Sequence, residues 1–547
     1  MQTTSRRQVE ASALTLAMSA FLAVVYNSKF WGTLTSAMGG SSVEKIPLGL
    51  AAFAAVLLIF NACLTLVSFR FLIKPIFVAL LVATSAAAYF TDQYGVAIDQ
   101  AMVQNVFETD AREASELLSW KMVLYVGVLG VLPALAVARL DIHFQPPLRG
   151  LAIRLAIVAA SLAGAAVLLL TSFKTLAPAV REHEELRHLL APANYLGALN
   201  SYLHSQWTTP LPIEAIGTDA HKGPAWAGQS RKTVTVIVVG ETARARNFSL
   251  NGYARDTNPQ LAREHGLINF SQVRACGTST GTSVPCIFSA LGREAFKGNR
   301  AHRQEGLLDV LAHAGFGVVW RDNNSGCKGV CDRVVYQDLS RPVAGDRNCR
   351  ADECYDERLL DGLPELIRSA GRDLVVVLHQ KGSHGPAYAK RYPQQFGRFK
   401  PACATTAFEK CSRASIEAAY DNTILYTDFF LSRLIGLLRR IDSKDGVDSA
   451  MLYVSDHGES LGENNLYLHG APYLIAPPEQ IHVPMMLWMS GRFSERFRLD
   501  PTCLRTRRHL PLSHDNVFHS VLGMLDVRSD VYRPGLSLFT PCGRQHG

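Results

Sequence analysis

The residues best suited to do chemistry lie in three short stretches that are far apart in the chain. Thr280 lies in a loop rich in glycine, serine and threonine, whereas Glu241 and the pair Asp456 and His457 each follow an apolar run typical of a buried strand. A threonine hydroxyl is a poor nucleophile at neutral pH unless a base or a metal activates it. Carboxylate oxygens and imidazole nitrogens are ligands that zinc accepts. The sequence therefore predicts a nucleophile beside the metal site that activates it.

The elements around these residues predict an α/β domain. Short β-branched runs at Val234–Val239, Leu374–Leu378 and Met451–Val454 alternate with helical stretches. This alternation is typical of a mostly parallel sheet, whose active sites gather beyond the carboxyl ends of the strands. His379 follows one of these runs directly, and Glu241 and Asp456 each follow one after a single residue. The helical stretches include Glu305–Ala314, Ser415–Arg440 and Asn516–Leu525.

Most of the long apolar runs lie in residues 1–173, and five of them are long enough to span a bilayer. Lysine and arginine concentrate in the loops on one side of these runs, and acidic residues in the loops on the other. The positive-inside rule then places the N-terminus in the cytoplasm, and five spans place everything after Phe173 outside it. The five expected spans are Ala11–Asn27, Ile46–Phe69, Leu72–Thr91, Met122–Ala138 and Leu151–Phe173.

Cysteine usage is an independent indication of export. Cys63 falls in an expected span, whereas the other ten of the 11 cysteines follow residue 270. Clustered, even-numbered cysteines in an exported segment favour disulfides, and these pairs lack the CxxC and histidine spacing of zinc knuckles. The expected pairs are Cys276 with Cys286, Cys327 with Cys331, Cys349 with Cys354 and Cys403 with Cys411, which leaves Cys503 and Cys542 as candidates for a fifth by elimination.

We expect three parts: a transmembrane domain at 1–173, a bridging segment at 174–231 and a catalytic domain at 232–547. In the bridging segment Tyr195, Leu199 and Tyr202 recur at helical spacing. This pattern suits a helix in the lipid headgroup plane and equally a helix packed on the catalytic domain. The net charge of +8 includes no run of basic residues interleaved with aromatics, so we expect membrane lipids and no nucleic acid as partners.

Several longer motifs make the chain resemble a known family. They are GETAR at 240–244, CGTSTGTSVPC at 276–286, DNNSGCKGVC at 322–331, HQKGSHGPAY at 379–388, YDNTILYTD at 420–428 and SDHGESLGENNLYLHG at 455–470. The part after residue 232 resembles the alkaline phosphatase/sulfatase superfamily. Nearly the whole chain resembles the lipid A phosphoethanolamine transferases, the class that includes mobile colistin-resistance enzymes. One departure is Gly281 and Thr282, where the family more often has Ala-Tyr.

The resemblance implies roles for individual residues. Glu241, Thr280, Asp456 and His457 would bind one catalytic zinc ion, with a second ion left open, and Thr280 would accept the phosphoethanolamine group. His384 and His469 would hold the phosphate or a second metal, although a lone histidine is more often structural. The plain alternatives for the zinc set are a helix cap at Thr280 and a polar strand end at Asp456.

Further residues are weaker candidates for substrate contact. Asn105, Thr109 and Glu113 share one helical face by their spacing of four residues, and the resemblance implies that they recognise the lipid donor. The alternative is a solvated polar face. Asn323 is expected to be a polar pocket residue, as is Asn422. Lys328 suits an anionic substrate, but a surface lysine is its default reading.

We therefore expect a monomeric, multi-pass protein of the bacterial inner membrane with its catalytic domain in the periplasm. It would transfer phosphoethanolamine from phosphatidylethanolamine to lipid A phosphates through a threonine intermediate, giving resistance to polymyxins such as colistin and to other cationic peptides. The alternatives are transfer to a heptose or glycan, and a phosphoglycerol transferase or sulfatase-like hydrolase. A membrane sensor or transporter is disfavoured because the spans lack buried charges.

The topology can be tested with a reporter fused after Gly547. A reporter enzyme that works only in the periplasm should give a signal in this fusion, because an odd number of spans carries the end of the chain across the membrane. Activity from a reporter that works only in the cytoplasm would contradict the five-span count.

Overall fold

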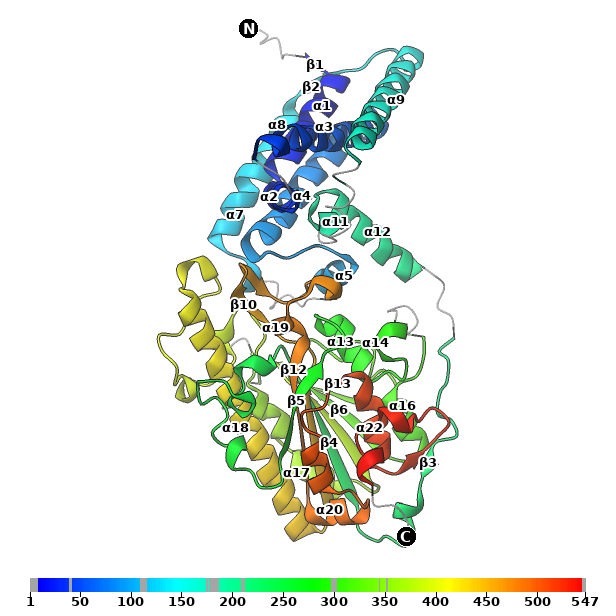
Figure 1. The fold of residues 1–547 in the computed structure, drawn as a ribbon, viewed down its shortest axis with the longest axis vertical. Coiled ribbons are helices and arrows are strands. Elements are labelled where there is room, and N and C mark those ends of the chain that lie inside the picture. The colour runs from blue at the N-terminus through cyan, green and yellow to red at the C-terminus, as the bar shows by residue number, and fades with distance from the viewer. Residues whose placement is uncertain are drawn as a thin grey trace. The chain divides into compact units, whose positions relative to one another are not determined.

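A computed structural model describes residues 8–38, 42–108, 116–173, 176, 186–207, 212–296, 303–343, 345–350 and 353–543. The chain folds into two compact units (Figure 1). One comprises Met1–Val103 and Leu118–His204, and the other comprises Gln104–Leu117 and Ser205–Gly547. Each is described by itself. The predicted boundaries at 173 and 231 stay a proposal, and the placement of Gln104–Leu117 with the catalytic unit was not foreseen.

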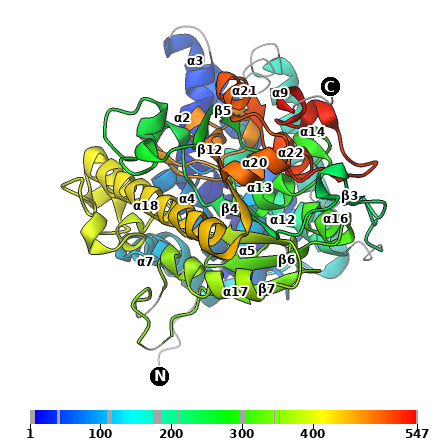
Figure 2. The ribbon, with the colours of Figure 1, turned by 90° about the horizontal axis from the view of Figure 1, so that it is seen from below.

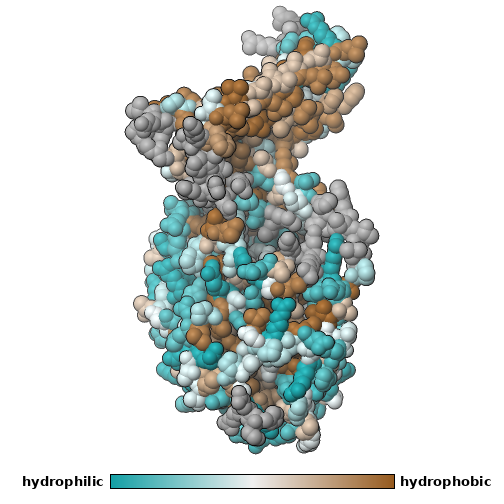
Figure 3. All heavy atoms as spheres, turned by 45° about the vertical axis from the view of Figure 1, so that its right-hand side comes forward, coloured by the Kyte–Doolittle hydropathy of each residue, from teal (hydrophilic) through white to brown (hydrophobic). Residues whose placement is uncertain are grey.

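The first unit is helical, and apolar side chains dominate its face in Figure 3. Among the described residues, four helical stretches could each cross a membrane: Ile46–Leu66, Ile73–Tyr94, Trp120–Arg139 and Pro147–Thr171. The predicted first span is not one straight helix, because α1 bends by 66° into α2, and the two together could form a fifth span. The elements are β1 (Gln8–Glu10), α1 (Ala11–Val25), α2 (Ser28–Ala37), α3 (Ser42–Leu66), α4 (Ile73–Tyr94), α7 (Trp120–Val126), the π-helical η1 (Gly127–Val131), α8 (Leu132–Arg139), β2 (Asp141–His143), α9 (Pro147–Thr171), α11 (Leu186–Leu189) and α12 (Ala193–Trp207).

The second unit is built on an eight-stranded sheet in the order β13-β5-β12-β9-β4-β8-β6-β7. The sheet is mostly parallel, as predicted, and β12 is its antiparallel member, since it runs opposite to both β5 and β9. The four adjacent parallel strands β9, β4, β8 and β6 consist mainly of apolar residues, which suits parallel strands covered on both faces. The strands are β4 (Thr233–Gly240), β5 (Ile268–Arg274), β6 (Gly317–Asp322), β7 (Val335–Asp338), β8 (Leu374–His379), β9 (Asp448–Ser455), β12 (His482–Met489) and β13 (Leu512–Ser513).

Helices cover both faces of this sheet (Figure 2). The 33-residue helix α18 (Arg413–Asp445) lies on one face, and α13 (Thr280–Ile287), α16 (Leu307–His313) and α22 (Asp515–Met524) lie on the other. On the second face Ile237, Val377 and Leu452 belong to one buried apolar cluster with side chains of these three helices. The remaining elements are α5 (Gln100–Glu108), β3 (His221–Lys222), α14 (Gly292–Ala295), α17 (Leu363–Ser369), β10 (Ser460–Glu463), β11 (Leu466–Leu468), α19 (Pro478–Ile481), α20 (Gly491–Arg496), α21 (Pro501–Thr506) and β14 (Val527–Arg528).

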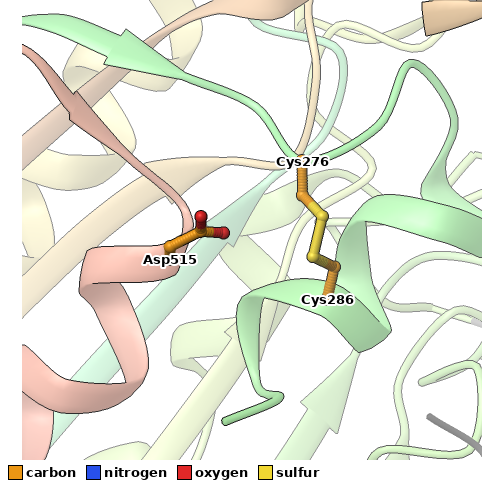
Figure 4. A group of neighbouring side chains, drawn as sticks. All are labelled: Cys276, Cys286 and Asp515. Atoms are coloured by element: carbon orange, nitrogen blue, oxygen red, sulfur yellow. A yellow bond between two sulfur atoms is a disulfide. The ribbon is translucent and has the colours of Figure 1, made fainter. Parts of the chain in front are cut away.

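Five disulfides join the cysteines of the second unit in the pairs expected from the sequence, including Cys503 with Cys542, and Cys63 is free. Figure 4 shows the Cys276–Cys286 bond between the end of β5 and α13, with Asp515 nearby. Cys276, Cys286 and Asp515 are residue types that can bind a metal, but the two sulfur atoms are bonded to each other in the disulfide. Asp515 accepts a hydrogen bond from the backbone of Arg293 at 2.8 Å instead. The disulfide therefore fixes the loop that carries Thr280.

Candidate active site

The register of the sheet brings distant parts of the sequence to one edge. Gly240 at the end of β4 lies opposite Ser455 at the end of β9. Glu241 and Asp456 are the next residues of these neighbouring strands. On the other side of β4, strands β8 and β6 end in the paired residues His379 and Asp322. Four adjacent parallel strands therefore deliver polar side chains to the same edge, where the sequence predicted three of them, β4, β8 and β9.

Four side chains converge at this edge. The Thr280 Oγ1 lies 3.1 Å from each carboxylate oxygen of Glu241 and 3.4 Å from Nε2 of His457. The same Nε2 atom lies 3.4 Å from Oε1 of Glu241 and 3.3 Å from Oδ2 of Asp456. Glu241, Asp456 and His457 are fully buried. The predicted nucleophile and the three predicted ligands thus form one compact cluster.

The geometry of this cluster fits a tetrahedral metal ion. Zinc bonds of about 2.0–2.2 Å place tetrahedral ligand atoms about 3.3–3.6 Å apart, close to the separations observed. The buried Oδ2 of Asp456 has no hydrogen-bond partner within the described part of the chain. Nδ1 of His457 lies 2.9 Å from the Gly458 carbonyl. That contact places the proton on Nδ1 and directs the lone pair of Nε2 toward the cluster.

The charges of the cluster suit a bound cation. Burial and the negative charge of Glu241 raise the pKa of the Asp456 carboxyl well above its usual value, because two carboxylates in a dry site repel each other. Burial and the neighbouring His469 lower the pKa of His457 to about 3, so its ring is neutral at pH 7. A divalent cation would relieve the carboxylate repulsion and find a neutral imidazole ready to bind.

The backbone after β4 is strained where it holds these groups. Thr242 has a φ of 58°, a conformation that β-branched residues rarely adopt. Its N–H donates to Oδ1 of Asp456 at 3.0 Å, and its carbonyl accepts from the Tyr420 hydroxyl at 2.7 Å. A Cβ atom on Gly382 would lie 2.6 Å from the Glu241 carbonyl, so only glycine fits there. Strain of this kind is typical of functional sites that the surrounding structure holds in place.

A second group of polar residues lies behind Glu241, and of its members the sequence singled out His379 but not Asn324 or Asp322. Asn324 donates to Oε2 of Glu241 at 2.6 Å, and its amide lies 3.3 Å from Nε2 of His379. Nδ1 of His379 lies 3.0 Å from Oδ2 of Asp322, which also accepts from the Trp320 indole at 2.7 Å. Partners of this kind orient metal ligands and set their basicity. His379 therefore contacts Asn324 and Asp322, and it is not one of the four side chains of the cluster.

Asn324, for which the sequence predicted no role, contacts the cluster, whereas the predicted Asn323 has other partners. The predicted pocket residue Asn323 donates to the Cys354 carbonyl at 3.1 Å and to Asp356 at 2.8 Å, whereas its neighbour Asn324 contacts Glu241. Successive residues at a strand end point in opposite directions, so a shift of one position separates the two roles. A contact between Asn323 and substrate stays a prediction.

The two further histidines lie beside the cluster. The ring of His469 lies 4.4 Å from that of His457 and 5.5 Å from that of His384, measured between centroids. Nδ1 of His469 lies 2.8 Å from the buried carboxylate of Glu459, which also accepts from the Tyr388 hydroxyl. This contact fixes the ring of His469 with Nε2 facing away from Glu459. Their predicted contact with phosphate remains a prediction.

The loop that carries Thr280 is tied to the end of β9 by His514, which the sequence did not single out. Its Nδ1 accepts from the Cys276 N–H at 3.0 Å, and its Nε2 lies 2.9 Å from the Ser455 carbonyl. Burial lowers the pKa of His514 to about 4, which keeps it neutral for both contacts. Helix α13 starts at Thr280 itself.

The remaining candidates either contact residues other than those of the cluster or lie outside the described residues. Lys328 contacts the Ser325 carbonyl at 3.2 Å, and Asn422 donates to the Phe399 carbonyl at 3.1 Å. Asn105 lies in α5, which the structure follows to Glu108. Thr109 and Glu113 lie outside the described residues. The proposed donor-binding face of this segment therefore stays a prediction.

Two protein families match the chain. The family described as phosphoethanolamine transferase EptA/EptB matches residues 56–207, and the sulfatase family matches residues 233–527. The phosphoethanolamine transferase EptA of Escherichia coli K12 is 38% identical over 526 residues, covering 96% of this chain and 95% of its own. The phosphatidylethanolamine transferase Mcr-1 of Escherichia coli is 36% identical over 544 residues, and the match covers 97% of this chain and 98% of Mcr-1.

A solved structure extends the match to the fold. The integral membrane lipooligosaccharide phosphoethanolamine transferase A of Neisseria meningitidis superposes with a TM-score of 0.93 at 34% identity. The match covers 98% of this chain and 100% of that one. With its apolar helices, its sulfatase-type sheet and relatives of matching length, this chain belongs to the family of integral membrane phosphoethanolamine transferases.

Proposed function

We propose that this transferase moves phosphoethanolamine from phosphatidylethanolamine to a phosphate of lipid A through a covalent intermediate on Thr280. The observation that carries the proposal is the convergence of the Thr280 hydroxyl on Glu241 and His457. The similarity to EptA and Mcr-1 supports the donor and the lipid acceptor. We place the protein in the bacterial inner membrane with its catalytic unit in the periplasm, which suits the disulfides of that unit.

In the first step the Thr280 oxygen attacks the donor phosphorus. Its hydroxyl donates toward the Glu241 carboxylate at 3.1 Å, so its proton has an acceptor as the new O–P bond forms. The bond from phosphorus to the diacylglycerol oxygen breaks, and diacylglycerol leaves as an alcohol after gaining a proton. A zinc ion held by Glu241, Asp456 and His457 would lower the pKa of the Thr280 hydroxyl and neutralise phosphate charge.

In the second step a phosphate oxygen of lipid A attacks the phosphothreonine. The O–P bond to Thr280 breaks, and Thr280 recovers its proton. We assign the phosphate oxygens in both steps to His384 and His469, because their rings lie beside the cluster. The product gains a primary amine, so the outer leaflet becomes less negative. Weaker binding of polymyxins and other cationic peptides would follow.

Other acceptors remain open within this proposal. Heptose or glycan hydroxyls could receive the same group, and water would make the enzyme a hydrolase. The Thr280 cluster serves all of these reactions equally, because the first step does not involve the acceptor. Mass spectrometry of lipid A from cells with and without the protein would identify the acceptor.

Replacing the nucleophile tests the covalent step. Thr280→Ala should lower transfer by about a thousandfold or more, since removing a nucleophile removes the reaction path itself. Thr280→Ser should keep measurable activity because it retains the hydroxyl. Lipid A modification followed by mass spectrometry gives the readout, with the amount of folded protein as the control. Normal modification by the alanine variant would rule out the threonine intermediate.

Removing a metal ligand tests the zinc site. The purified protein should contain about one zinc ion per chain. His457→Ala and Asp456→Asn should lose most of this zinc and the transfer activity together, because each leaves too few ligands. Elemental analysis measures the metal, and added zinc should restore a chelated wild-type sample. Full activity in a metal-free preparation would contradict the assignment.

The group behind Glu241 gives a finer test with a matched control. Asn324→Ala should weaken zinc affinity about 10-fold to 100-fold, since partners that orient a metal ligand have effects of this size. Asn323→Ala removes the same amide one residue away, where it contacts Asp356 and not Glu241. Competition with a zinc chelator should therefore show a larger loss for Asn324→Ala. Equal affinities in the two variants would remove Asn324 from the metal site.

A further inference from the structure

One arginine near the loop that carries Thr280 has no counter-ion within the described residues. Arg293 lies in α14, which follows α13 closely in the chain. Its guanidinium lies over the ring of Tyr473, 3.4 Å from the ring centroid. No carboxylate of the described residues forms an ion pair with this guanidinium, and its buried Nε atom has no hydrogen-bond partner there. Arg293 is therefore a partly buried positive charge that the described part of the chain does not balance.

Hydrogen bonds tie the Tyr473 ring to the residues that precede Thr280. The Tyr473 hydroxyl donates to the Ala275 carbonyl at 2.9 Å. Two residues before Tyr473, the Ala471 carbonyl accepts from the Thr278 hydroxyl at 2.6 Å. The aromatic surface under the guanidinium is therefore fixed to the same loop that presents the nucleophile.

The backbone of Arg293 is held in place as well. Its N–H donates to Oδ1 of Asp515 at 2.8 Å, and Figure 4 shows Asp515 near the Cys276–Cys286 disulfide. Gly292 has a φ of 70°, and a Cβ atom there would lie 3.3 Å from the carboxyl carbon of Asp515. Asp515 thus contacts the backbone of Arg293 and forms no ion pair with its guanidinium. The charge is fixed in position at both ends of the side chain.

This arrangement suits the binding of a phosphate. A guanidinium that stacks on a ring keeps its plane fixed, and its N–H edge can bind a phosphate through two hydrogen bonds. A buried nitrogen without a partner costs free energy, which an anionic ligand can offset. The lipid donor has one phosphate, which reacts at Thr280, and its ammonium group would be repelled by Arg293. Lipid A has more than one phosphate, so one can bind while another reacts.

We propose that Arg293, stacked on Tyr473, binds the phosphate of lipid A that does not react. This inference rests on the proposed function, since it takes lipid A as the acceptor. The bound phosphate orients the acceptor for the second step, in which its other phosphate attacks the phosphothreonine. Leu474, the residue after Tyr473, is 81% exposed and offers an apolar contact to the same lipid.

Arg293→Gln in the full-length enzyme tests this site, because it removes the charge and keeps a polar side chain. The two acceptors are lipid A with two phosphates and a form with one phosphate that still receives the group. Each is tested in vesicles of phosphatidylethanolamine and phosphatidylcholine, which contain no other anionic lipid. With the two-phosphate acceptor, kcat/KM should fall about 10-fold to 100-fold, the scale of a hydrogen bond to a charged group. With the one-phosphate acceptor it should stay within about twofold of the wild type, because the contact with Arg293 is already missing.

Two further variants complete the test. Arg293→Lys keeps the charge but not the paired N–H edge, so it should retain only part of the preference for two phosphates, and it replaces the glutamine variant if that one does not fold. Arg368→Gln is the matched control. It also removes one positive charge, from a side chain that is 51% exposed and precedes β8 at the opposite edge of the sheet. It should leave both rates within about twofold of the wild type.

The results separate this inference from the proposed function. An unchanged rate with the two-phosphate acceptor in Arg293→Gln, or equal losses with both acceptors, would overturn the role of Arg293 while leaving the proposed function in place. A wild-type enzyme that transfers the group to neither form of lipid A would overturn both.

Discussion

The rest of the catalytic unit depends on two carboxylates that are buried side by side. Glu241 and Asp456 follow adjacent parallel strands, so the sheet forces them together and the fold removes them from water. Their repulsion would destabilise the unit unless a cation lies between them. Neutral His457 and the Thr280 hydroxyl complete a set of four oxygen and nitrogen donors around that position. The demand for a cation and the activation of a nucleophile thus arise from one arrangement.

Many polar contacts around the sheet edge hold this arrangement in place. The strained backbone of Thr242 satisfies one oxygen of Asp456 through its N–H. Asn324 restrains Glu241 from behind, and His514 ties the nucleophile loop to β9. A loose cluster would let the hydroxyl drift from the phosphorus, and a shift of about 1 Å can lower a rate about a hundredfold. These contacts therefore maintain reactivity as well as stability.

The sequence predicted the parallel sheet and the cluster members because each follows a recognisable apolar run or lies in a distinctive motif. It could not distinguish Asn324 from Asn323, since that choice depends on the direction of one side chain after β6. The bend between α1 and α2 was missed because a straight and a bent apolar helix have the same composition. The contact of His514 with Cys276 spans 238 positions, and no local pattern reports such a contact.

Under the proposed mechanism, the cluster around Thr280 would explain how the phosphoethanolamine group leaves its donor, but it would not explain why a lipid should receive the group. Water could complete the reaction on the same phosphothreonine. A transferase must therefore keep water away from the intermediate until the lipid acceptor has reacted with it. The segment Gln104–Leu117 groups with the catalytic unit although it lies between membrane-spanning helices in the sequence. In the proposed mechanism, specificity for lipids would therefore reside in residues outside the cluster, which leave the reaction at Thr280 unchanged.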